Sequence, residues 1–137
     1  PLILGGGITD GAGIRAAEVL GADLAYMGTR FIACEESLAP PAYRDMLVSS
    51  TVDDLILTRA ITGVAANWLK PSIANAGMNL DAMEKNPDID FTDPQSGAKR
   101  WAQVWSAGHG VGLIDRTEPA ASLIARLKEE YEAARKR

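Results

Sequence analysis

The sequence is poor in the residues that build disulfides, metal sites and aromatic surfaces. Its 137 residues include one cysteine, one histidine and only 6% aromatic residues. Because a single cysteine cannot form a disulfide within the chain, we expect a reducing, cytoplasmic location. We also expect Cys34 to be buried as a small apolar residue. The acidic residues lack EF-hand spacing and have no His or Cys partners, so we predict no metal site.

The sequence also lacks an excess of positive charge and any long apolar run. The net charge is −4 at pH 7, so the overall charge of the chain does not attract nucleic acids or anionic membranes. No apolar run approaches the roughly 20 residues that span a bilayer. The content of 47% hydrophobic and 23% charged residues is typical of a globular protein with a core. We therefore expect a small-molecule ligand and no nucleic-acid or membrane partner.

The first 27 residues have the pattern strand, loop, helix, strand. The wholly apolar residues 1–4 precede three glycines, which is typical of a strand buried on both faces of a parallel sheet. Asp10 predicts the N-cap of a helix that runs to about Leu20, and Gly21 predicts its C-cap. Residues 23–27 predict a second strand. In nearly all such β-α-β units the strands are parallel and the crossover is right-handed.

A glycine-bearing loop follows each of these two strands. Residues 5–7 follow the first strand, and Gly28 and Thr29 follow the second. Because parallel strands end at the same edge of a sheet, we expect the loops to lie side by side and to expose backbone N–H groups to a ligand. The start of the helix at residues 10–13 adds partial positive charge. The pattern therefore predicts a phosphate site.

Two other phosphate-binding motifs do not fit the sequence. A Rossmann fingerprint that includes Gly5 and Gly7 requires Gly or Ala at the position of Asp10. Its ribose-binding acid belongs at the C-terminal end of the second strand, whereas Asp23 lies at the beginning of that strand. The chain also has no Walker A motif, which excludes a P-loop.

The remaining sequence predicts a mainly helical extension over residues 38–106 and a loop with a helix over residues 107–137. The expected elements of the extension are a helix at 42–48 after Pro40 and Pro41, strands at 55–61 and 64–69, a helix at 71–83, a loop at 86–97, and a helix at 98–106 with Trp101 and Trp105 on one face. A helix broken at Gly63 competes with the hairpin. Residues 108–112 predict a flexible loop, and Thr117 predicts the N-cap of a final amphipathic helix.

Two strings of residues resemble the nitronate monooxygenase (2-nitropropane dioxygenase) family. They are Gly6-Gly7-Ile8, Asp10-Gly11, residues 20–23, residues 27–31 and Glu36-Ser37 in the first string, and residues 106–114 (SAGHGVGLI) in the second. The resemblance implies an FMN-dependent TIM barrel. Because a whole (β/α)8 barrel takes roughly 250 residues, we predict an α/β fold that is the C-terminal part of a TIM barrel. It would contain the last two parallel strands with their helices, plus the mainly helical extension, in a single partial domain.

The resemblance also implies which residues bind the cofactor. In that family the FMN phosphate is held by the GGI loop and by the residues around MGT, so residues 1–37 would form the phosphate-binding strand 7-helix-strand 8 unit. The expected FMN-binding residues are Gly6, Gly7, Tyr26, Met27, Gly28 and Thr29, with His109 near the cofactor rim. Arg30 either adds charge to this site or pairs on the surface with Glu35 or Glu36. No catalytic residue is expected in this chain, because the family's catalytic histidine lies on the N-terminal side of the GGI loop.

The activity implied by the resemblance is the oxidation of alkyl nitronates with O2. One alternative is a flavin enzyme that uses NAD(P)H, such as an enoyl-acyl carrier protein reductase or a quinone reductase. Another is a partial barrel that binds phosphate-bearing ligands or assembles with another chain without catalysis. Because two parallel strands expose apolar edges, we expect a homo-oligomer or pairing with the remainder of the barrel.

Overall fold

The computed structural model describes residues 1–85 and 104–137, and these form two compact units. One unit contains residues 1–52 and 108–137, and the other contains residues 53–107. Each unit is described by itself below. No helix within the described part of the chain is both long and apolar enough to cross a membrane.

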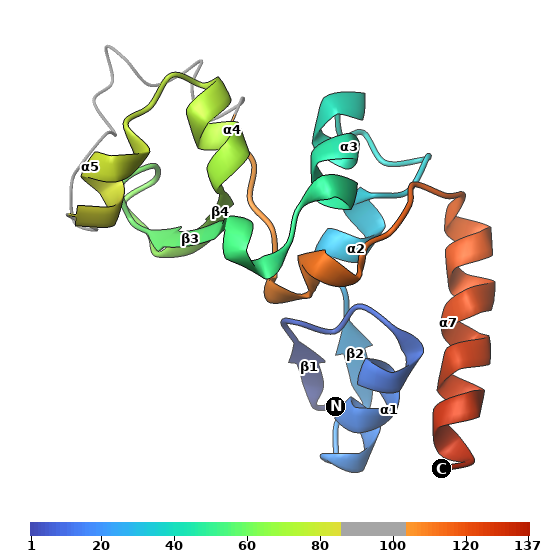
Figure 1. The fold of residues 1–137 in the computed structure, drawn as a ribbon. Coiled ribbons are helices and arrows are strands. Elements are labelled where there is room, and N and C mark those ends of the chain that lie inside the picture. Colours follow the sequence, from blue (N-terminus) through green and yellow to red (C-terminus); the bar gives the residue numbers. More distant parts are fainter. Residues whose placement is uncertain (86–103) are drawn as a thin grey trace. The chain divides into compact units, whose positions relative to one another are not determined.

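The first unit begins with the β-α-β arrangement that the sequence predicts (Figure 1). Strand β1 (Ile3–Gly5), helix α1 (Gly11–Val19) and strand β2 (Leu24–Tyr26) follow in order. The two strands are parallel, with Ile3 opposite Leu24 and Gly5 opposite Tyr26. Their C-terminal ends therefore lie at one edge, as the placement of both glycine loops requires.

Local hydrogen bonds explain where α1 begins and ends. The Asp10 carboxylate accepts a hydrogen bond of 2.7 Å from the Gly13 amide, so the predicted N-cap is confirmed. The helix ends at Leu20, and Gly21 follows with φ +94°, a conformation that glycine adopts without steric cost. Helix α1 thus ends where the sequence places its C-terminus.

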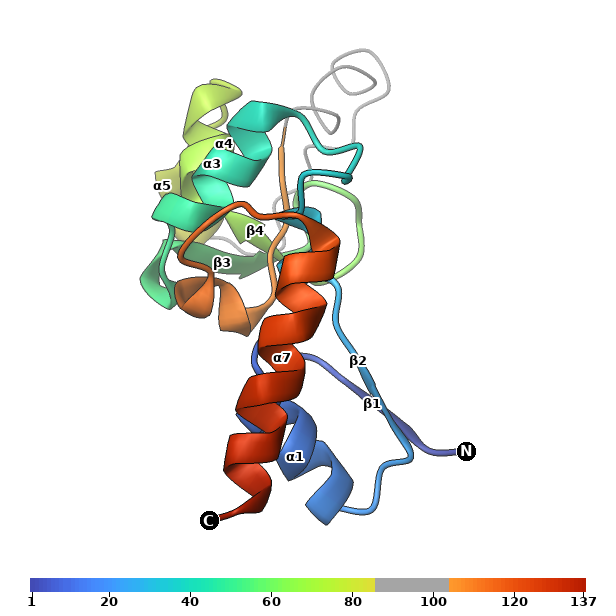
Figure 2. The ribbon, with the colours of Figure 1, turned by 90° about the vertical axis from the view of Figure 1, so that its right-hand side faces the viewer.

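Four further elements complete the first unit. They are helix α2 (Thr29–Ile32), helix α3 (Pro41–Ser49), the 3-10 helix η2 (His109–Leu113) and helix α7 (Ala120–Arg135). Figures 1 and 2 show α7 beside α1. The two helices pack closely at Gly11, where an added Cβ atom would lie only 2.3 Å from the Tyr131 nitrogen and 2.4 Å from the Leu127 oxygen. The lack of a side chain at Gly11 permits this approach. The buried core of this packing centres on Cys34, Leu123 and Leu127.

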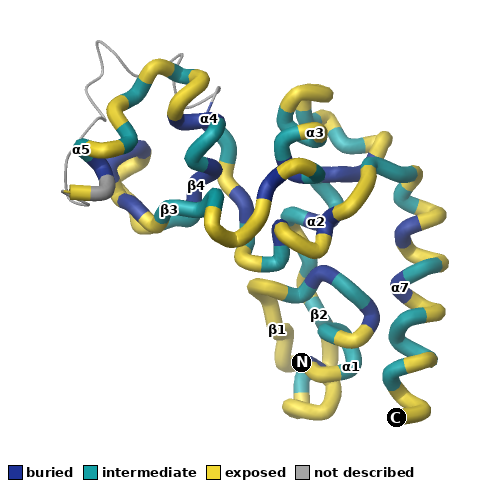
Figure 3. Tube along the Cα trace, in the orientation of Figure 1, coloured by how far each residue is buried: buried dark blue, intermediate teal, exposed yellow. Residues whose placement is uncertain are grey.

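The two strands of the first unit are exposed, which contradicts the prediction that residues 1–4 are buried on both faces (Figure 3). Ile3 is 55% exposed and Leu24 is 56% exposed. The physical reason is that β1 and β2 pair only with each other in the described chain. Their apolar residues suit a larger sheet, but no further strand of the described residues pairs with them.

The second unit contains a hairpin and short helices. Strand β3 (Leu55–Thr58) pairs with β4 (Ala66–Leu69) in antiparallel register, which confirms the hairpin over the broken-helix alternative. Helices α4 (Lys70–Asn75) and α5 (Leu80–Lys85) follow. The predicted single helix at 71–83 is wrong, because Gly77 has φ +71° and breaks it.

The last described segment of the second unit is extended. Trp105 accepts a hydrogen bond of 2.8 Å from the Leu69 amide, and Ser106 forms a bridge with Trp68. The predicted helix at 98–106 is therefore wrong at residues 104–106, because pairing with the edge of β4 replaces helical hydrogen bonds. The rest of that helix, with Trp101, and the predicted loop at 86–97 lie outside the described residues. The core of this unit includes Trp68, Ile73, Met83 and Val104.

Candidate functional site

A small pocket lies at the edge where β1 and β2 end. Its volume is about 150 Å³. It is lined by residues from three segments of the first unit, namely Gly6, Gly7, Ile8, Thr9, Tyr26, Gly28, Thr29, Gly108 and Gly110. Five of the predicted site residues thus meet in one place, although some lie more than 20 positions apart in the sequence. The lining contains no carboxylate that would repel an anion.

The loop after β1 forms the first wall of the pocket. Gly6 has φ +95° and Gly7 has φ +70°, so two consecutive residues adopt a conformation that side-chain-bearing residues rarely take. A Cβ atom on either glycine would meet nothing within 4 Å. The backbone of this loop is therefore open to a ligand that approaches from the pocket.

The residues between β2 and α2 form the second wall. Gly28 is the N-cap of α2, and its Cβ position is also open. The Thr29 hydroxyl accepts a hydrogen bond of 2.8 Å from the Gly108 amide. A hydroxyl that accepts one bond still has its own hydrogen to donate. The second wall can therefore offer both a main-chain and a side-chain donor.

The third wall comes from the start of η2, far along the chain, and sequence reasoning missed its main residues. Gly108 binds Thr29, and Gly110 packs so closely on the first wall that an added Cβ atom would lie 1.8 Å from Thr9 Oγ1 and 3.1 Å from the Gly7 oxygen. The available signal was the string at residues 106–114, from which the sequence analysis took only the family resemblance, His109 and a flexible loop at residues 108–112. Glycine at position 110 permits the close approach of two backbones.

Two predicted cofactor-binding residues do not line the pocket. Met27 packs against the buried cluster around Cys34 and Leu127, while its neighbours Tyr26 and Gly28 face the pocket. His109 lies exposed in η2, between two glycines that line the pocket. Met27 thus belongs to the core that supports the site, and His109 lies at its periphery.

Two backbone amides in the first turn of α1, where the sequence predicts partial positive charge, donate to carboxylates. Asp10 accepts from the Gly13 amide, and the Glu130 carboxylate of α7 accepts a hydrogen bond of 2.8 Å from the Gly11 amide. Two carboxylates already satisfy this helix end. Residues 10–13 do not line the pocket, so the contribution of their partial positive charge to anion binding stays a prediction, and the loop glycines are the candidate donors.

Arg30 takes a role that the sequence did not indicate. It is only 2% exposed, and its guanidinium donates to Glu118 Oε1 at 2.7 Å. The predicted surface pair with Glu35 or Glu36 is wrong. Glu36 instead accepts hydrogen bonds of 2.9 and 3.1 Å from the amide of Ala120, and so caps α7.

Two further predictions concern this region. The predicted N-cap at Thr117 is wrong, because Pro119 is the N-cap residue of α7 and the Glu36 carboxylate satisfies the Ala120 amide. Cys34 is 3% exposed, so its predicted burial is confirmed. Desolvation raises the pKa of the Cys34 thiol above its usual value, and the negative charges of Glu36 and Glu118 raise it further. This cysteine is therefore a poor nucleophile.

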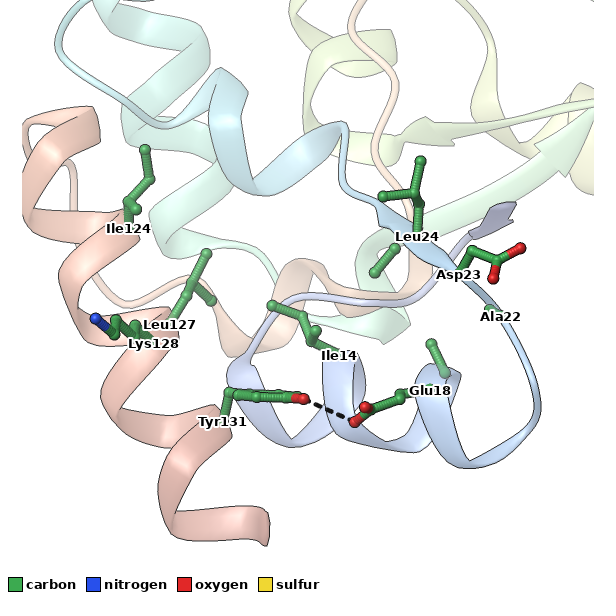
Figure 4. Close-up of a pocket in the computed structure, with 11 residues that line it drawn as sticks. Ile14, Glu18, Ala22, Asp23, Leu24, Ile124, Leu127, Lys128 and Tyr131 are labelled. Carbon is green, nitrogen blue, oxygen red and sulfur yellow. Dashed lines mark hydrogen bonds between the residues drawn. The ribbon is translucent and has the colours of Figure 1, made fainter. Parts of the chain in front are cut away.

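A larger pocket of about 420 Å³ lies between α1, β2 and α7 (Figure 4). Its lining is mostly apolar and includes Ile14, Leu24 and Leu127. At its rim the Tyr131 hydroxyl donates to Glu18 Oε2 at 2.7 Å. This contact, together with Arg15, lowers the pKa of Glu18. The lining offers a hydrophobic surface and no group of side chains arranged for catalysis.

The family model for nitronate monooxygenase matches residues 1–130. The chain belongs to the nitronate monooxygenase family. It is 35% identical over 142 residues to a nitronate monooxygenase of Paraburkholderia phytofirmans, and 36% identical over 140 residues to one of Pseudomonas aeruginosa. Each match covers 95% of this chain, but only 37% and 39% of the respective relative. The chain thus spans about two fifths of the length of these family members.

Solved structures give the same relationship in three dimensions. The chain resembles a nitroalkane oxidase from Streptomyces ansochromogenes with a TM-score of 0.73 and 30% identity, over 99% of this chain and 40% of that one. It resembles FabK from Thermotoga maritima with a TM-score of 0.73 and 29% identity, over 99% and 45% of the two chains. The predicted α/β class is confirmed, and the chain corresponds to part of these longer structures.

Proposed function

We propose that the chain supplies the FMN phosphate site of a nitronate-oxidising flavoenzyme. The observation that carries this proposal is the pocket in which the two glycine loops meet. The backbone amides of Gly7 and Gly28 donate to no acceptor within the described residues. Preorganised amides of this kind are suited to a phosphate dianion, because they offer donors without bringing a competing charge.

The residues fit the phosphate end of FMN and not the whole cofactor. Pockets that enclose complete ligands usually have volumes of about 300–1,000 Å³, whereas this pocket has about 150 Å³. The resemblance implies that strands preceding the GGI loop would cradle the flavin ring. We propose that β1 and β2 are the last two strands of a TIM barrel, where loops after strands 7 and 8 commonly bind phosphate.

Within this proposal each wall has a separate task. Gly6 and Gly7 allow the backbone to approach the phosphate closely, and Gly28 and Thr29 supply donors from the opposite side. When bound, FMN supplies the redox chemistry for the oxidation of a nitronate by O2. The residues of this chain bind and orient the cofactor, and the proton-transferring residue would lie outside the chain.

The test is a comparison of FMN with riboflavin, which lacks the phosphate. We expect the purified protein to bind FMN more tightly than riboflavin. Gly28→Leu should abolish most of this difference, because Gly28 has φ −99° and an open Cβ position, so leucine can fill the pocket without strain. A hydrogen bond to a charged group contributes about 1.5–3 kcal/mol, so FMN affinity should fall by roughly tenfold to a hundredfold.

Ala16→Leu is the matched control, because Ala16 is exposed on α1 and does not line the pocket. Its FMN affinity should equal that of the wild type. Equal binding of FMN and riboflavin by the wild-type protein would remove the phosphate assignment.

The resemblance of the sequence leaves a second candidate activity open, a flavin oxidoreductase that uses NAD(P)H. Both activities place the same demand on the phosphate pocket, so the pocket does not separate them. In a protein that carries the rest of the barrel, oxygen consumption with an alkyl nitronate should exceed NAD(P)H oxidation if the first proposal holds. The reverse ranking would favour the second.

The exposed strands favour a third candidate function, assembly. Leu2, Ile3, Leu24 and Tyr26 are each more than half exposed, and apolar surface of this kind is typical of sites that bind another chain. We propose that these strands pair with the remainder of a barrel or with a second copy. Sedimentation that shows only a compact monomer would contradict this assembly.

A further inference from the structure

A series of ion pairs links residues that adjoin the first and second walls of the pocket. Arg30 Nη2 lies 2.7 Å from Glu118 Oε1, and the same oxygen contacts Arg126 Nη2. Arg126 Nη1 lies 3.5 Å from Glu130 Oε1. The other Glu130 oxygen accepts a hydrogen bond of 2.8 Å from the Gly11 amide. We call Arg30, Glu118, Arg126 and Glu130 the ion-pair series.

Each end of the ion-pair series lies close in sequence to a residue that lines the pocket. Arg30 directly follows Thr29 of the second wall, and Gly11 lies two positions after Thr9 of the first wall. The series therefore connects the two walls through Glu118 and α7. The pocket itself contains none of its four charged side chains.

The surroundings of the series leave little freedom for it to rearrange. The side chains of Arg30 and Glu118 are 1% and 13% exposed, so water competes weakly for this pair. At the other end, Gly11 packs against the backbone of α7 with no room for a Cβ atom. A shift of α7 would therefore move both ends of the series, and with them both walls.

We propose that the ion-pair series sets the separation of the two walls, and so determines the preference of the site for a ligand that bears a phosphate. Its members are positioning residues, since they act through Thr29 and through the loop that ends at Thr9. This inference rests on the proposed FMN phosphate site. A series with a purely structural role would affect the stability of the unit and leave ligand preference unchanged.

Glu118→Gln tests the proposal, because it removes the charge that holds both arginines while the side chain keeps its shape. The experiment measures the dissociation constants of FMN and riboflavin and the thermal midpoint for each protein. We expect the FMN affinity to fall at least tenfold, with riboflavin affinity unchanged within twofold. Asp115→Asn is the matched control. Asp115 lies three residues before Glu118, and its substitution breaks the exposed ion pair between Asp115 and Arg116. Its affinity ratio should equal that of the wild type.

A second variant covers the case in which Glu118→Gln does not fold. Arg126→Lys keeps the positive charge but cannot hold Glu118 and Glu130 in the same forked geometry. We expect it to lower the ratio of riboflavin to FMN dissociation constants by a smaller factor. The inference is overturned if either folded variant keeps the wild-type ratio, or if both ligands weaken equally. A wild-type protein that does not distinguish FMN from riboflavin overturns the proposed function as well, which separates the two failures.

Discussion

Alanine at position 110 should weaken FMN binding, because the third wall leaves no space for a methyl group. An added Cβ atom would lie 1.8 Å from Thr9 Oγ1 and 3.0 Å from Thr9 Cβ, whereas non-bonded carbon atoms are most stable at about 3.5–4.0 Å. Thr9 is 6% exposed, so its side chain has little room to turn away. Overpacking of this kind costs about 1–3 kcal/mol.

Part of this strain should be relieved by movement of the third wall away from the first. If the strain falls entirely on binding, 1–3 kcal/mol corresponds to an FMN affinity that is about 5- to 150-fold lower. Fluorescence titration of FMN with purified Gly110→Ala measures this loss. A thermal melt of the same sample reports how much of the strain appears as lost stability.

Gly112 provides a matched control in the same 3-10 helix. A Cβ atom there would meet Thr51 and Val52 at 3.8 Å, which is ordinary contact, so Gly112→Ala should keep wild-type FMN affinity. Adding Thr9→Ala to Gly110→Ala removes the nearest clashing atom and should restore part of the binding. If Gly110→Ala and Gly112→Ala bind FMN equally well, the close contact of the first and third walls is not what shapes the pocket.

Three further predictions test other parts of the structure. Gly11→Ala should lower the thermal midpoint, because the alanine Cβ atom would lie 2.3–2.5 Å from α7. The loss should appear although alanine favours a helix over glycine by about 1 kcal/mol. Gly13→Ala should change the thermal midpoint much less, since its Cβ atom would have its nearest contact at 3.3 Å. Ile73→Ala in the second unit should lower the free energy of unfolding of that unit by about 2–5 kcal/mol, since Ile73 is 0% exposed. Denaturant unfolding measures this loss, and it should be far smaller for Leu57→Ala, because Leu57 is 64% exposed. Stability should fall as the pH rises above 9.0, the usual pKa of a thiol, because Cys34 ionises there in the unfolded chain but stays protonated in the folded one; Cys34→Ala should lose that part of the pH dependence.

The sequence was informative where local rules decide the structure. Asp10 caps a helix through its own carboxylate, and the parallel pairing of two apolar runs follows from the β-α-β connection. These two features place Gly7 and Gly28 at one edge, so the first and second walls of the pocket were predictable from 29 residues. The hairpin was predicted only as one of two alternatives, because strand-forming residues and a turn at Gly63 also fitted a broken helix.

The sequence was less informative where distant segments compete for the same group. Glu130 reaches the Gly11 amide from 119 positions away, and Glu118 reaches Arg30 from 88 positions away. No spacing rule relates such residues, because their proximity depends on how α7 packs against α1. The extended conformation of Trp105 has a similar origin, since its hydrogen bond to Leu69 joins segments 36 positions apart.

The course of the chain through the first unit has a consequence for how the protein can be altered. Residues 53–107 lie between two stretches that form a single compact unit, and a Cβ atom added to Gly112 would lie 3.8 Å from the backbone of Thr51 and Val52. The end of the first stretch thus lies near residue 112 of the second, and lengthening a connection costs only about 0.6 kcal/mol for each doubling. A short glycine-serine bridge in place of residues 53–107 would keep every residue that lines the pocket. Such a bridge would therefore separate the proposed phosphate site from the hairpin unit.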